Sequence, residues 1–354
     1  MRTSLIISLS QFRENIKNIR KKLEPETKFL AVVKADAYGH GALKIAKTAE
    51  KENVDYFGVA TLDEAIELRE GGVQTPILIL TEPLDNSISR AFYYDVSLTI
   101  YSKKMLNKLA RLKDKYSKPI KLHLKVDTGM NRIGIQEKEV IPFIKEIKKY
   151  PNFYLEGLLT HLAESDNKCS NYANEQYDRF FEIINLLKKN NIEIPLIHMA
   201  NSGAIINFPR TQLDMVRTGI ALYKNVATFK TRILQIKYVQ KNEPIGYSRG
   251  FVASEKIRIA VLSVGYADGY SRLLSNKGAV LIKGQHCPIV GNICMDISMV
   301  SIPEELNINV GDEVTLIGDD NDSKISVDDI ADLMGTISYE VLCSIGKRAI
   351  RIYN

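Results

Sequence analysis

The hydrophobic pattern of this chain changes near residue 228, and that change constrains the fold more than any other feature. Before it, short apolar runs alternate with longer amphipathic stretches about eight times. The runs are rich in β-branched residues and are bounded by Gly, Pro, Asn or Asp, as is typical of buried parallel strands. They cover residues 29–33, 56–60, 77–80, 96–100, 120–126, 155–161, 195–199 and 213–217. The alternation predicts a (β/α)8 barrel, with a doubly wound open sheet as the alternative.

The stretches between these runs carry helix signals. Residues 61–64, T-L-D-E, have the form of a capping box, and Gly71-Gly72 closes the segment that follows. Between residues 177 and 187, aromatic and aliphatic residues recur at helical spacing before Asn190-Asn191. These signals support helices that alternate with the strands.

After residue 227 the long helical periods disappear. Residues 233–239, 257–264, 279–282 and 313–317 are strand-like, with one short helix expected from about Ser326 to Met334. We therefore expect an α/β protein of two domains. A barrel covers residues 1–227 and a mainly-β domain covers residues 228–354, and the first residues of the chain can pair with the β domain.

Composition excludes several classes of protein. Lys and Arg number 48 against 42 Asp and Glu among 354 residues, without a polybasic tail, so neither nucleic acid nor an anionic membrane is expected as a partner. The four cysteines are scattered without a C-x-x-C pair, so we expect neither a disulfide framework nor a metal site. Apolar runs are too short for a signal peptide or a membrane span, which predicts a cytoplasmic protein.

Charged side chains stand at several of the strand ends that form the mouth of such a barrel. Lys34, Lys125, His161 and Arg217 occupy four of these ends, where barrel enzymes place their functional groups. Lys34 directly follows an apolar run, and partial desolvation there favours the neutral amine that Schiff-base chemistry needs. A lysine that merely reaches from a strand end into solvent is the alternative. The polar, glycine-punctuated loop over residues 35–41 favours the functional interpretation.

A second cluster indicates a phosphate site. Asn201-Ser202-Gly203 opens a short helix after the seventh run, and Gly219 follows Arg217 after the eighth. Barrels bind phosphate at these two loops through backbone N–H groups and small hydroxyls, although the same residues are common in turns. A lysine and a phosphate site at one barrel mouth point to pyridoxal phosphate, and a sugar-phosphate aldolase that forms a Schiff base is the alternative.

An ordered set of motifs resembles the bacterial alanine racemases, which depend on pyridoxal phosphate. The segment V-K-A-D-A-Y-G-H-G at 33–41 is similar to the cofactor attachment motif of that family. The resemblance continues, in order and across both expected domains, at residues 125–134, 160–161, 198–202, 216–220, 265–269, 294–296 and 338–340. It implies a barrel joined to a C-terminal β domain, and an enzyme that interconverts L-alanine and D-alanine.

The resemblance also implies roles for individual residues. Lys34 would hold the cofactor covalently and act as one catalytic base, while Tyr266 would be the second base, presented by the partner subunit of a homodimer with shared active sites. Arg217 would face the pyridine nitrogen with His198 behind it. Contacts with the cofactor are implied for Tyr38, His161, Asn201, Ser202, Arg217, Gly219, Ile220 and Tyr339.

Further residues are implied to act on the substrate or to support those that do. Arg132 would contact the substrate carboxylate, as would Met295 from the partner subunit, with Asp296 in support. Lys125 matches a lysine that is often carbamylated in the family, where the added negative charge would steady Arg132.

The implied residue types suit racemisation. A proton must leave one face of Cα and return on the other, so two bases must flank the reacting carbon. An arginine stays protonated, so at the pyridine nitrogen it would leave that nitrogen unprotonated and limit side reactions such as transamination.

Three other functions remain as alternatives. One is a serine or broad-specificity racemase, although Tyr339 favours a small alanine pocket. A second is a decarboxylase that uses pyridoxal phosphate, which would normally place a carboxylate where Arg217 stands. A third is a non-catalytic pyridoxal-phosphate-binding protein, which would lack the β domain.

The chain departs from the family in places. Residues 348–351 lack the usual proline, which we expect to affect the turn of the tail and not the chemistry. Lys224 stands where many members have glycine, at an edge of the phosphate loop, and His286 lies on the stretch that lines the substrate entrance.

Overall fold

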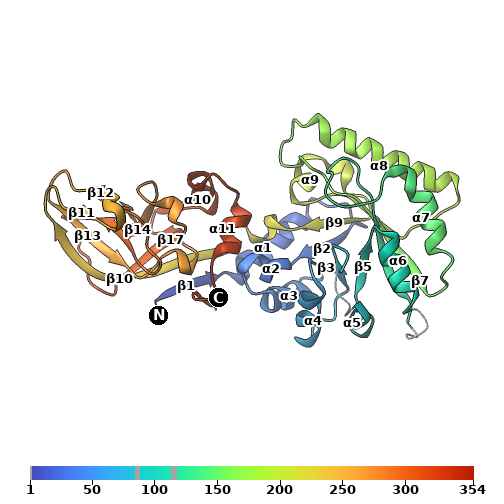
Figure 1. Ribbon diagram of the computed structural model, residues 1–354, viewed down its shortest axis with the longest axis horizontal. Coiled ribbons are helices and arrows are strands. Elements are labelled where there is room, and N and C mark those ends of the chain that lie inside the picture. Colours follow the sequence, from blue (N-terminus) through green and yellow to red (C-terminus); the bar gives the residue numbers. More distant parts are fainter. Residues whose placement is uncertain (1, 84–87, 113–117) are drawn as a thin grey trace. The chain divides into compact units, whose positions relative to one another are not determined.

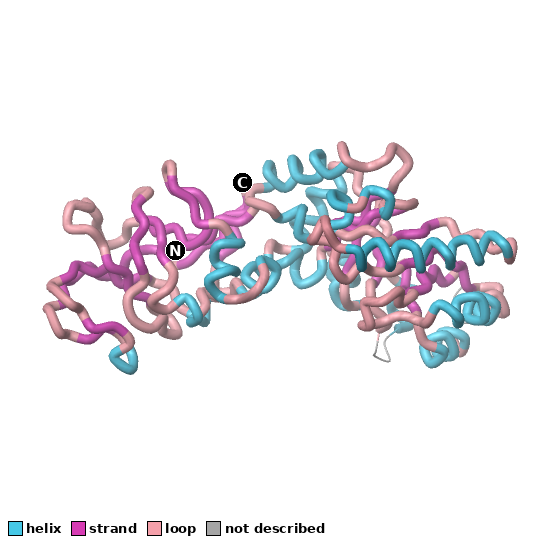
Figure 2. Tube along the Cα trace, turned by 90° about the horizontal axis from the view of Figure 1, so that it is seen from above, coloured by secondary structure: helices cyan, strands magenta, loops and turns pink. Residues whose placement is uncertain are grey.

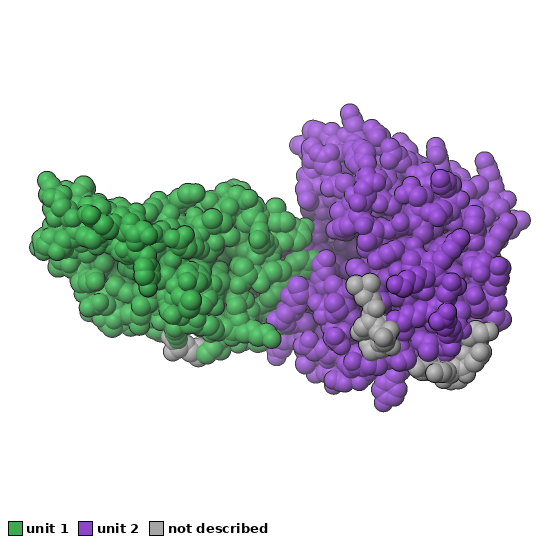
Figure 3. All heavy atoms as spheres, viewed as in Figure 1, with its two compact units in different colours: residues 1–12, 38–41, 223–354 green, residues 13–37, 42–222 purple. Residues whose placement is uncertain are grey.

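The computed structural model describes residues 2–83, 88–112 and 118–354. Its chain divides into two compact units, shown in different colours in Figure 3. Unit 1 comprises residues 1–12, 38–41 and 223–354, and unit 2 comprises residues 13–37 and 42–222. The domain boundary expected at residue 228 stays a prediction. Neither compact unit is one continuous stretch of sequence, because residues 1–12 and 38–41 belong to unit 1.

Unit 2 is built around the predicted barrel. Eight parallel strands close on themselves, with the first strand, β2, paired to both β3 and β9. The strands are β2 (Lys28–Val32), β3 (Tyr56–Val59), β4 (Ile77–Ile79), β5 (Ser97–Ile100), β6 (Ile120–Lys125), β7 (Phe153–Leu159), β8 (Leu196–His198) and β9 (Met215–Thr218). The α/β fold class with its closed barrel is therefore confirmed, and each strand falls within one of the eight predicted runs or overlaps it (Figure 1).

Helices follow the barrel strands in alternation. Thr61 caps α4 through the predicted capping box, and α8 begins after the N-cap Ser170. The helices of this part of the chain are α1 (Leu9–Arg20), α2 (Lys34–Gly39), α3 (Ala42–Lys51), α4 (Leu62–Glu70), α5 (Ser89–Tyr93), α6 (Lys103–Ala110), α7 (Val140–Ile147), α8 (Asn171–Lys189) and α9 (Ser202–Asn207). Short 3-10 turns occur at Glu137–Glu139 (η3), Pro209–Thr211 (η4) and Ile220–Tyr223 (η5).

Unit 1 is mostly strand and loop, as Figure 2 shows. Its main sheet has the order β15-β14-β17-β10-β1-β19, and the long β10 also pairs with β13, which in turn pairs with β16. The strands are β1 (Thr3–Ile7), β10 (Ala227–Val239), β11 (Pro244–Ile245), β12 (Phe251–Val252), β13 (Ile257–Leu262), β14 (Ala279–Ile282), β15 (Gln285–Pro288), β16 (Ser298–Ser301), β17 (Glu313–Asp320), β18 (Ser323–Ile325) and β19 (Ile350–Tyr353). The first strand of the chain thus lies between β10 and the last strand.

Short helical segments complete unit 1. The predicted helix near residue 326 is α10 (Val327–Met334), capped by Ser326, and α11 (Ser338–Ser344) follows it. The 3-10 turns of this unit are η6 (Tyr247–Arg249), η7 (Tyr266–Asp268) and η8 (Arg272–Leu274). Among the helices that the structure describes, none has the length and apolar character to cross a membrane.

Candidate active site

Lys34 begins an unusual helical turn at the C-terminal end of β2. Ala35, Asp36, Ala37 and Tyr38 of α2 all have φ near 53°, which is the left-handed region. L-residues disfavour this conformation by roughly 1–2 kcal/mol each, so surrounding contacts must hold the turn. A left-handed turn changes the direction of the backbone immediately after the strand, and Lys34 is fixed at that point.

Two carboxylates of unit 2 hold this turn. Glu64 accepts a hydrogen bond from the Ala35 N–H at 2.7 Å, and its other oxygen accepts from the Ala60 N–H at 2.7 Å. Asp36 accepts from the Ala42 N–H at 2.7 Å and so joins the turn to the start of α3. The position of Lys34 is therefore coupled to the loop after the next barrel strand.

Positive charges gather at the barrel mouth around Lys125. Burial, reinforced by the charges of Arg217, Arg132 and Lys34, lowers the pKa of Lys125 to about 7. Burial and the same cationic neighbours hold the pKa of His161 well below its ordinary value, so its imidazole is neutral. The site thus combines a partly neutral lysine with an excess of positive charge, which suits an anionic ligand.

Arg217, near the end of β9, is buried among neutral acceptors. Its Nη1 donates one of its two hydrogens to His198 Nδ1 at 2.9 Å. Nη2 donates to the Met199 carbonyl at 2.9 Å and to the Thr160 carbonyl at 2.6 Å, and it lies 3.1 Å from His161 Nδ1. Within the described residues these contacts leave the second Nη1 hydrogen and the Nε hydrogen available to a ligand acceptor.

The loops after β8 and β9 are joined through Ser202. Its hydroxyl oxygen accepts from the backbone N–H groups of Gly219 at 2.9 Å and Ala221 at 3.4 Å, so its own hydrogen can be donated to an anion. Asn201 instead caps α9, accepting from the Ala204 N–H at 3.1 Å and from Ser165 at 2.6 Å. Gly219 precedes Ile220, which begins η5. The structure thus assembles the predicted phosphate loops in unit 2.

Tyr38 and Tyr339 belong to unit 1, where they lie in one aromatic group. The Tyr38 ring centroid is 4.8 Å from that of Tyr223 and 5.9 Å from that of Tyr339. Burial, assisted by Tyr339 and Cys343, raises the pKa of Tyr38 far above its ordinary value. The Tyr38 phenol therefore remains protonated and able to donate a hydrogen bond.

Tyr266 and Met295 project from two adjoining loops of unit 1. The Tyr266 N–H donates to the Cys294 carbonyl at 3.1 Å, and the Ala267 N–H donates to the Met295 carbonyl at 3.0 Å. A Cβ on Gly265 would lie 2.3 Å from the Cys294 oxygen, so only glycine permits this approach. The side chains of Tyr266 and Met295 are 44% and 54% exposed, although both are large and largely apolar.

Four charged side chains form a group of ion pairs at these two loops. Arg348 pairs with Asp296 at 2.7 Å and with the fully buried Asp268 at 3.2 Å. Arg2 pairs with the same two carboxylates, at 3.4 Å to Asp268 and 3.6 Å to Asp296. The expectation that the missing proline of residues 348–351 affects only the turn of the tail stays a prediction, while Arg348 of the same segment contacts the loops that carry Tyr266 and Met295.

The structure distributes the predicted site residues over both units. Unit 2 brings together Lys34, Lys125, Arg132, His161, His198, Asn201, Ser202, Arg217, Gly219 and Ile220. Unit 1 carries Tyr38, Tyr266, Met295, Asp296 and Tyr339. Lys224 and His286 are exposed side chains of unit 1.

Sequence reasoning missed two residues behind Arg217. His123 Nδ1 lies 2.9 Å from His198 Nε2, and His123 Nε2 lies 2.9 Å from Glu156 Oε2. Glu156 was not singled out at all. The available signal was Gly157, because a glycine inside a strand often marks a close approach by another group, here the His123 ring.

The unit 2 residues fit pyridoxal phosphate. Arg217 has unused N–H groups inside the barrel mouth, and Ser202 has a hydroxyl hydrogen to donate where the loops after β8 and β9 meet. The charges of Lys34, Lys125, Arg132 and Arg217 suit the phosphate of the cofactor and its phenolate. Across the described residues, no group of three or more His, Cys, Asp and Glu side chains is placed to bind a metal ion.

Comparisons with known proteins agree over the whole chain. Residues 7–226 match the family model for the alanine racemase N-terminal domain, and residues 226–353 match that for the C-terminal domain. An alanine racemase of Halothermothrix orenii is 42% identical, over 98% of this chain and 95% of that protein.

Solved structures give the same result. The alanine racemase of Clostridium difficile 630 superposes with a TM-score of 0.95 at 36% identity, covering 100% of this chain and 96% of that one. The alanine racemase of Bartonella henselae, solved with covalently bound pyridoxal phosphate, has a TM-score of 0.91 at 29% identity and covers 100% of both chains.

Proposed function

This chain belongs to the alanine racemase family, and we propose that Lys34 and Tyr266 are the two bases of its reaction. It is an isomerase that interconverts L-alanine and D-alanine with pyridoxal phosphate as cofactor. The observation that carries the assignment of Lys34 is its place beside Lys125, Arg132 and Arg217 at the mouth of the barrel. The same group of positive charges supports the assignment of the barrel mouth as the cofactor site.

The residues of unit 2 would bind and orient the cofactor. Pyridoxal phosphate held there would supply an electron-withdrawing group that acidifies the Cα–H of alanine. Arg217 would direct a remaining N–H at the pyridine nitrogen and leave it unprotonated, because a guanidinium does not give up its proton. Ser202 and the Gly219 and Ile220 loop would contact the phosphate, together with Tyr38 and Tyr339.

Proton transfer then needs two groups on opposite faces of the substrate. We assign one face to the Lys34 amine and the other to the Tyr266 phenol. Each group would take a proton from Cα in one direction of the reaction and return one in the other direction. Arg132 and Met295 would hold the substrate carboxylate, which fixes the orientation of Cα between the two bases.

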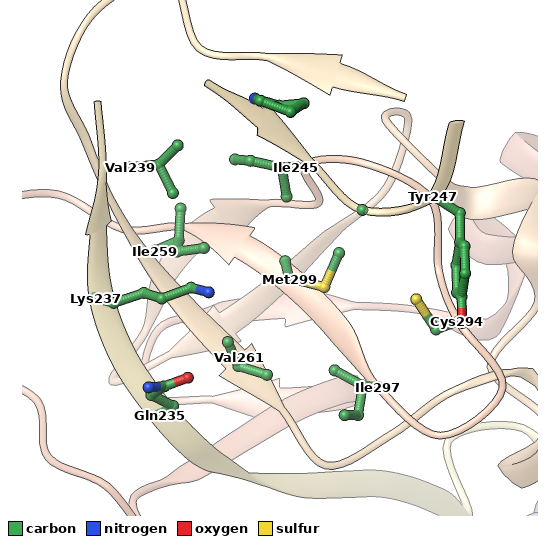
Figure 4. A pocket seen from close by; sticks show the side chains of 12 residues that line it. Gln235, Lys237, Val239, Ile245, Tyr247, Ile259, Val261, Cys294, Ile297 and Met299 are labelled. Atoms are coloured by element: carbon green, nitrogen blue, oxygen red, sulfur yellow. The ribbon is translucent and has the colours of Figure 1, made fainter. Parts of the chain in front are cut away.

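We place Tyr266 in the active site of a second subunit. Its exposure and that of Met295 support this, since large apolar side chains on one face mark protein contacts. An open hollow of about 510 Å³ on the same unit adds to the apolar surface, with Tyr247, Cys294 and Met299 in its lining (Figure 4). A homodimer with two equivalent shared sites accounts for these features.

Alanine is the substrate that the family assignment supports, and a serine or broader specificity is the second candidate. Supply of D-alanine for peptidoglycan and a location in the cytoplasm stay predictions from the sequence. The first follows from the family resemblance, and the second follows from apolar runs that are too short for a signal peptide or a membrane span.

Exchange in deuterated water tests the activity and both bases. The purified protein, loaded with pyridoxal phosphate, is incubated with L-alanine, and we expect deuterium at Cα together with D-alanine. Lys34→Ala and Tyr266→Phe should each abolish racemisation. Failure of the wild-type protein to form D-alanine would overturn the proposed function.

Mixing the two inactive variants tests the shared site. If each site takes Lys34 from one subunit and Tyr266 from the other, re-associated mixtures contain some sites with both wild-type residues. About a quarter of all sites would then be intact after random exchange. Activity that stays at the level of the separate variants after proven subunit exchange would contradict the shared site.

A further inference from the structure

A buried line of hydrogen bonds runs from Arg217 through the barrel interior to a carboxylate. It passes from Arg217 Nη1 to His198 Nδ1, from His198 Nε2 to His123 Nδ1, and from His123 Nε2 to Glu156 Oε2, each at 2.9 Å. The four residues come from four different strands, β9, β8, β6 and β7. We call these four residues the Arg217–Glu156 network.

The backbone is shaped to admit this network. The register between β6 and β7 shifts by one residue after Leu122, so that His123 pairs with Gly157 and Glu156 is the extra residue. Such a bulge redirects a side chain out of the regular alternation. A Cβ on Gly157 would lie 2.1 Å from His123 Nδ1, so the glycine is needed for the position of the imidazole.

The direction of every hydrogen bond follows from Arg217. A guanidinium can only donate, so His198 Nδ1 must accept and the proton of His198 is on Nε2. His198 therefore donates to His123 Nδ1, which places the His123 proton on Nε2, where it is donated to Glu156. A doubly protonated His123 is excluded, because its Nδ1–H would meet the Nε2–H of His198.

The network also settles where the charges are. The described hydrogen bonds of Arg217 all go to neutral acceptors, so its positive charge has no carboxylate in contact. Glu156 ends the network as an anion that also accepts from Ser97 at 2.6 Å and Tyr56 at 3.2 Å. Two neutral imidazoles thus connect a buried cation to a buried anion.

We propose that Glu156 and His123 are positioning residues for the reaction, acting on the pyridine nitrogen of the cofactor through His198 and Arg217. Their hydrogen bonds fix the single proton of each imidazole and thereby the guanidinium plane of Arg217. Without Glu156, the His123 Nε2–H loses its acceptor, so the His123 ring, and through it the His198 ring and the guanidinium of Arg217, is held less firmly in place. This inference rests on the proposed function in one respect, the placement of Arg217 at the cofactor.

Neutron diffraction from a deuterium-exchanged crystal of the holoenzyme tests the proton positions directly. We expect one deuteron on Nε2 of His123 and one on Nε2 of His198, and none on Nδ1 of either ring. A deuteron on Nδ1 of His198, or deuterons on both nitrogens of His123, would overturn the proposal. This readout does not depend on racemase activity.

Kinetics of two variants test the positioning role. Glu156→Gln keeps an oxygen acceptor and removes the charge, whereas His123→Leu interrupts the network. Loss of a supporting partner typically lowers activity by about 10–100-fold, so we expect His123→Leu to lower kcat on the order of tenfold and Glu156→Gln to lower it less. The KM for alanine should stay within about twofold, because neither residue touches the substrate.

Thr99→Val is the matched control. Thr99 pairs with His123 in the sheet register and is buried, and its hydroxyl has no hydrogen-bond partner in the described part of the chain. Its replacement should leave kcat and the cofactor absorbance unchanged. The network has no positioning role if two results are found together. The wild-type protein racemises alanine, and the folded variants Glu156→Gln and His123→Leu both retain the wild-type kcat. If wild-type protein itself is inactive, the proposed function fails instead.

Discussion

Arg348 Nη2 lies 2.7 Å from Asp296 Oδ1, and this ion pair joins the end of the chain to the loop that carries Met295. The same guanidinium reaches Asp268, two residues after Tyr266, at 3.2 Å. One side chain therefore ties together the loop of the proposed second base and the loop of a proposed substrate contact.

Arg348→Ala should weaken both stability and activity. It removes one of the two cations that pair with the buried Asp268, so we expect a lower free energy of unfolding, although Arg2 still pairs with that carboxylate. Misplacement of Tyr266 should also lower kcat on the order of tenfold. Urea unfolding and racemase assays measure the two effects. Lys347→Ala, at the exposed neighbouring position, is the control, and equal behaviour of the two variants would refute the role of the ion pair.

Lys125 should react with carbon dioxide. With a pKa of about 7, a large fraction of its amine is neutral near neutral pH, and the amine and CO2 form a carbamate with release of one proton. The product would be an anion among Arg132, Arg217 and Lys34, which favours its formation. A 13C carbonyl resonance should appear with labelled bicarbonate and be missing in Lys125→Ala.

Lys121→Ala is the matched control for this carbamate. Lys121 lies on the same strand but pairs with Asp95 at 3.1 Å, so its replacement should leave the resonance in place. Loss of the carbamate should weaken binding of alanine a few-fold through Arg132. A resonance that persists in Lys125→Ala would show that another amine reacts.

Ala35→Gly should stabilise the protein. Ala35 is exposed and has φ near 53°, where glycine is not penalised and alanine is, so we expect a gain of up to about 1 kcal/mol in the free energy of unfolding. Lys47→Gly, in the right-handed α3, should instead lose about 1 kcal/mol. Denaturant titrations compare the two. A destabilised Ala35→Gly would mean that contacts of the Ala35 methyl group outweigh the backbone strain.

Glu156 should make stability depend on pH in the acid range. Burial by itself raises the pKa of Glu156, but hydrogen bonds from His123 and Ser97 and the charge of Lys121 hold it well below its ordinary value. Its folded-state pKa is thus below the ordinary value of 4.5. The stability that its charge contributes is therefore complete above pH 4.5 and is lost as the pH falls toward 2.

Glu156→Gln cannot titrate and so reports this contribution. The advantage of the wild type over the variant should shrink across that pH range, because the wild type loses the contribution of its charge and the variant has none to lose. Urea unfolding of both proteins at several pH values measures it, and Glu146→Gln, at an exposed position of α7, is the control. A constant difference between wild type and Glu156→Gln would contradict the charged, hydrogen-bonded state of Glu156.

The barrel could be predicted because each buried parallel strand leaves the same local mark, an apolar run with turn residues on both sides. The mouth residues Lys34, His161 and Arg217 could be predicted for a related reason, since the end of such a run fixes the end of the strand. The family resemblance added Tyr266 and Met295, whose loop in the β domain carries no local signal of function.

Other parts of the site have no local signature. The left-handed turn after Lys34 is formed by two alanines, an aspartate and a tyrosine, and none of these residue types favours φ near 53° in the way glycine does. The bulge that brings Glu156 to His123 depends on the register between two strands about thirty residues apart, which alternation within one strand does not reveal. Arg2 and Arg348 meet Asp268 only because β1 and β19 are neighbours.

The place of β1 between β10 and β19 has a consequence for biosynthesis. Residues 13–222 of the barrel unit are complete once that stretch has left the ribosome, but the first seven residues must wait for partners that begin at residue 227 and end at residue 353. Strand β1 is thus ordered only after β19 has been synthesised, so the sheet that contains β10, β1 and β19 cannot be complete before residue 353 has left the ribosome.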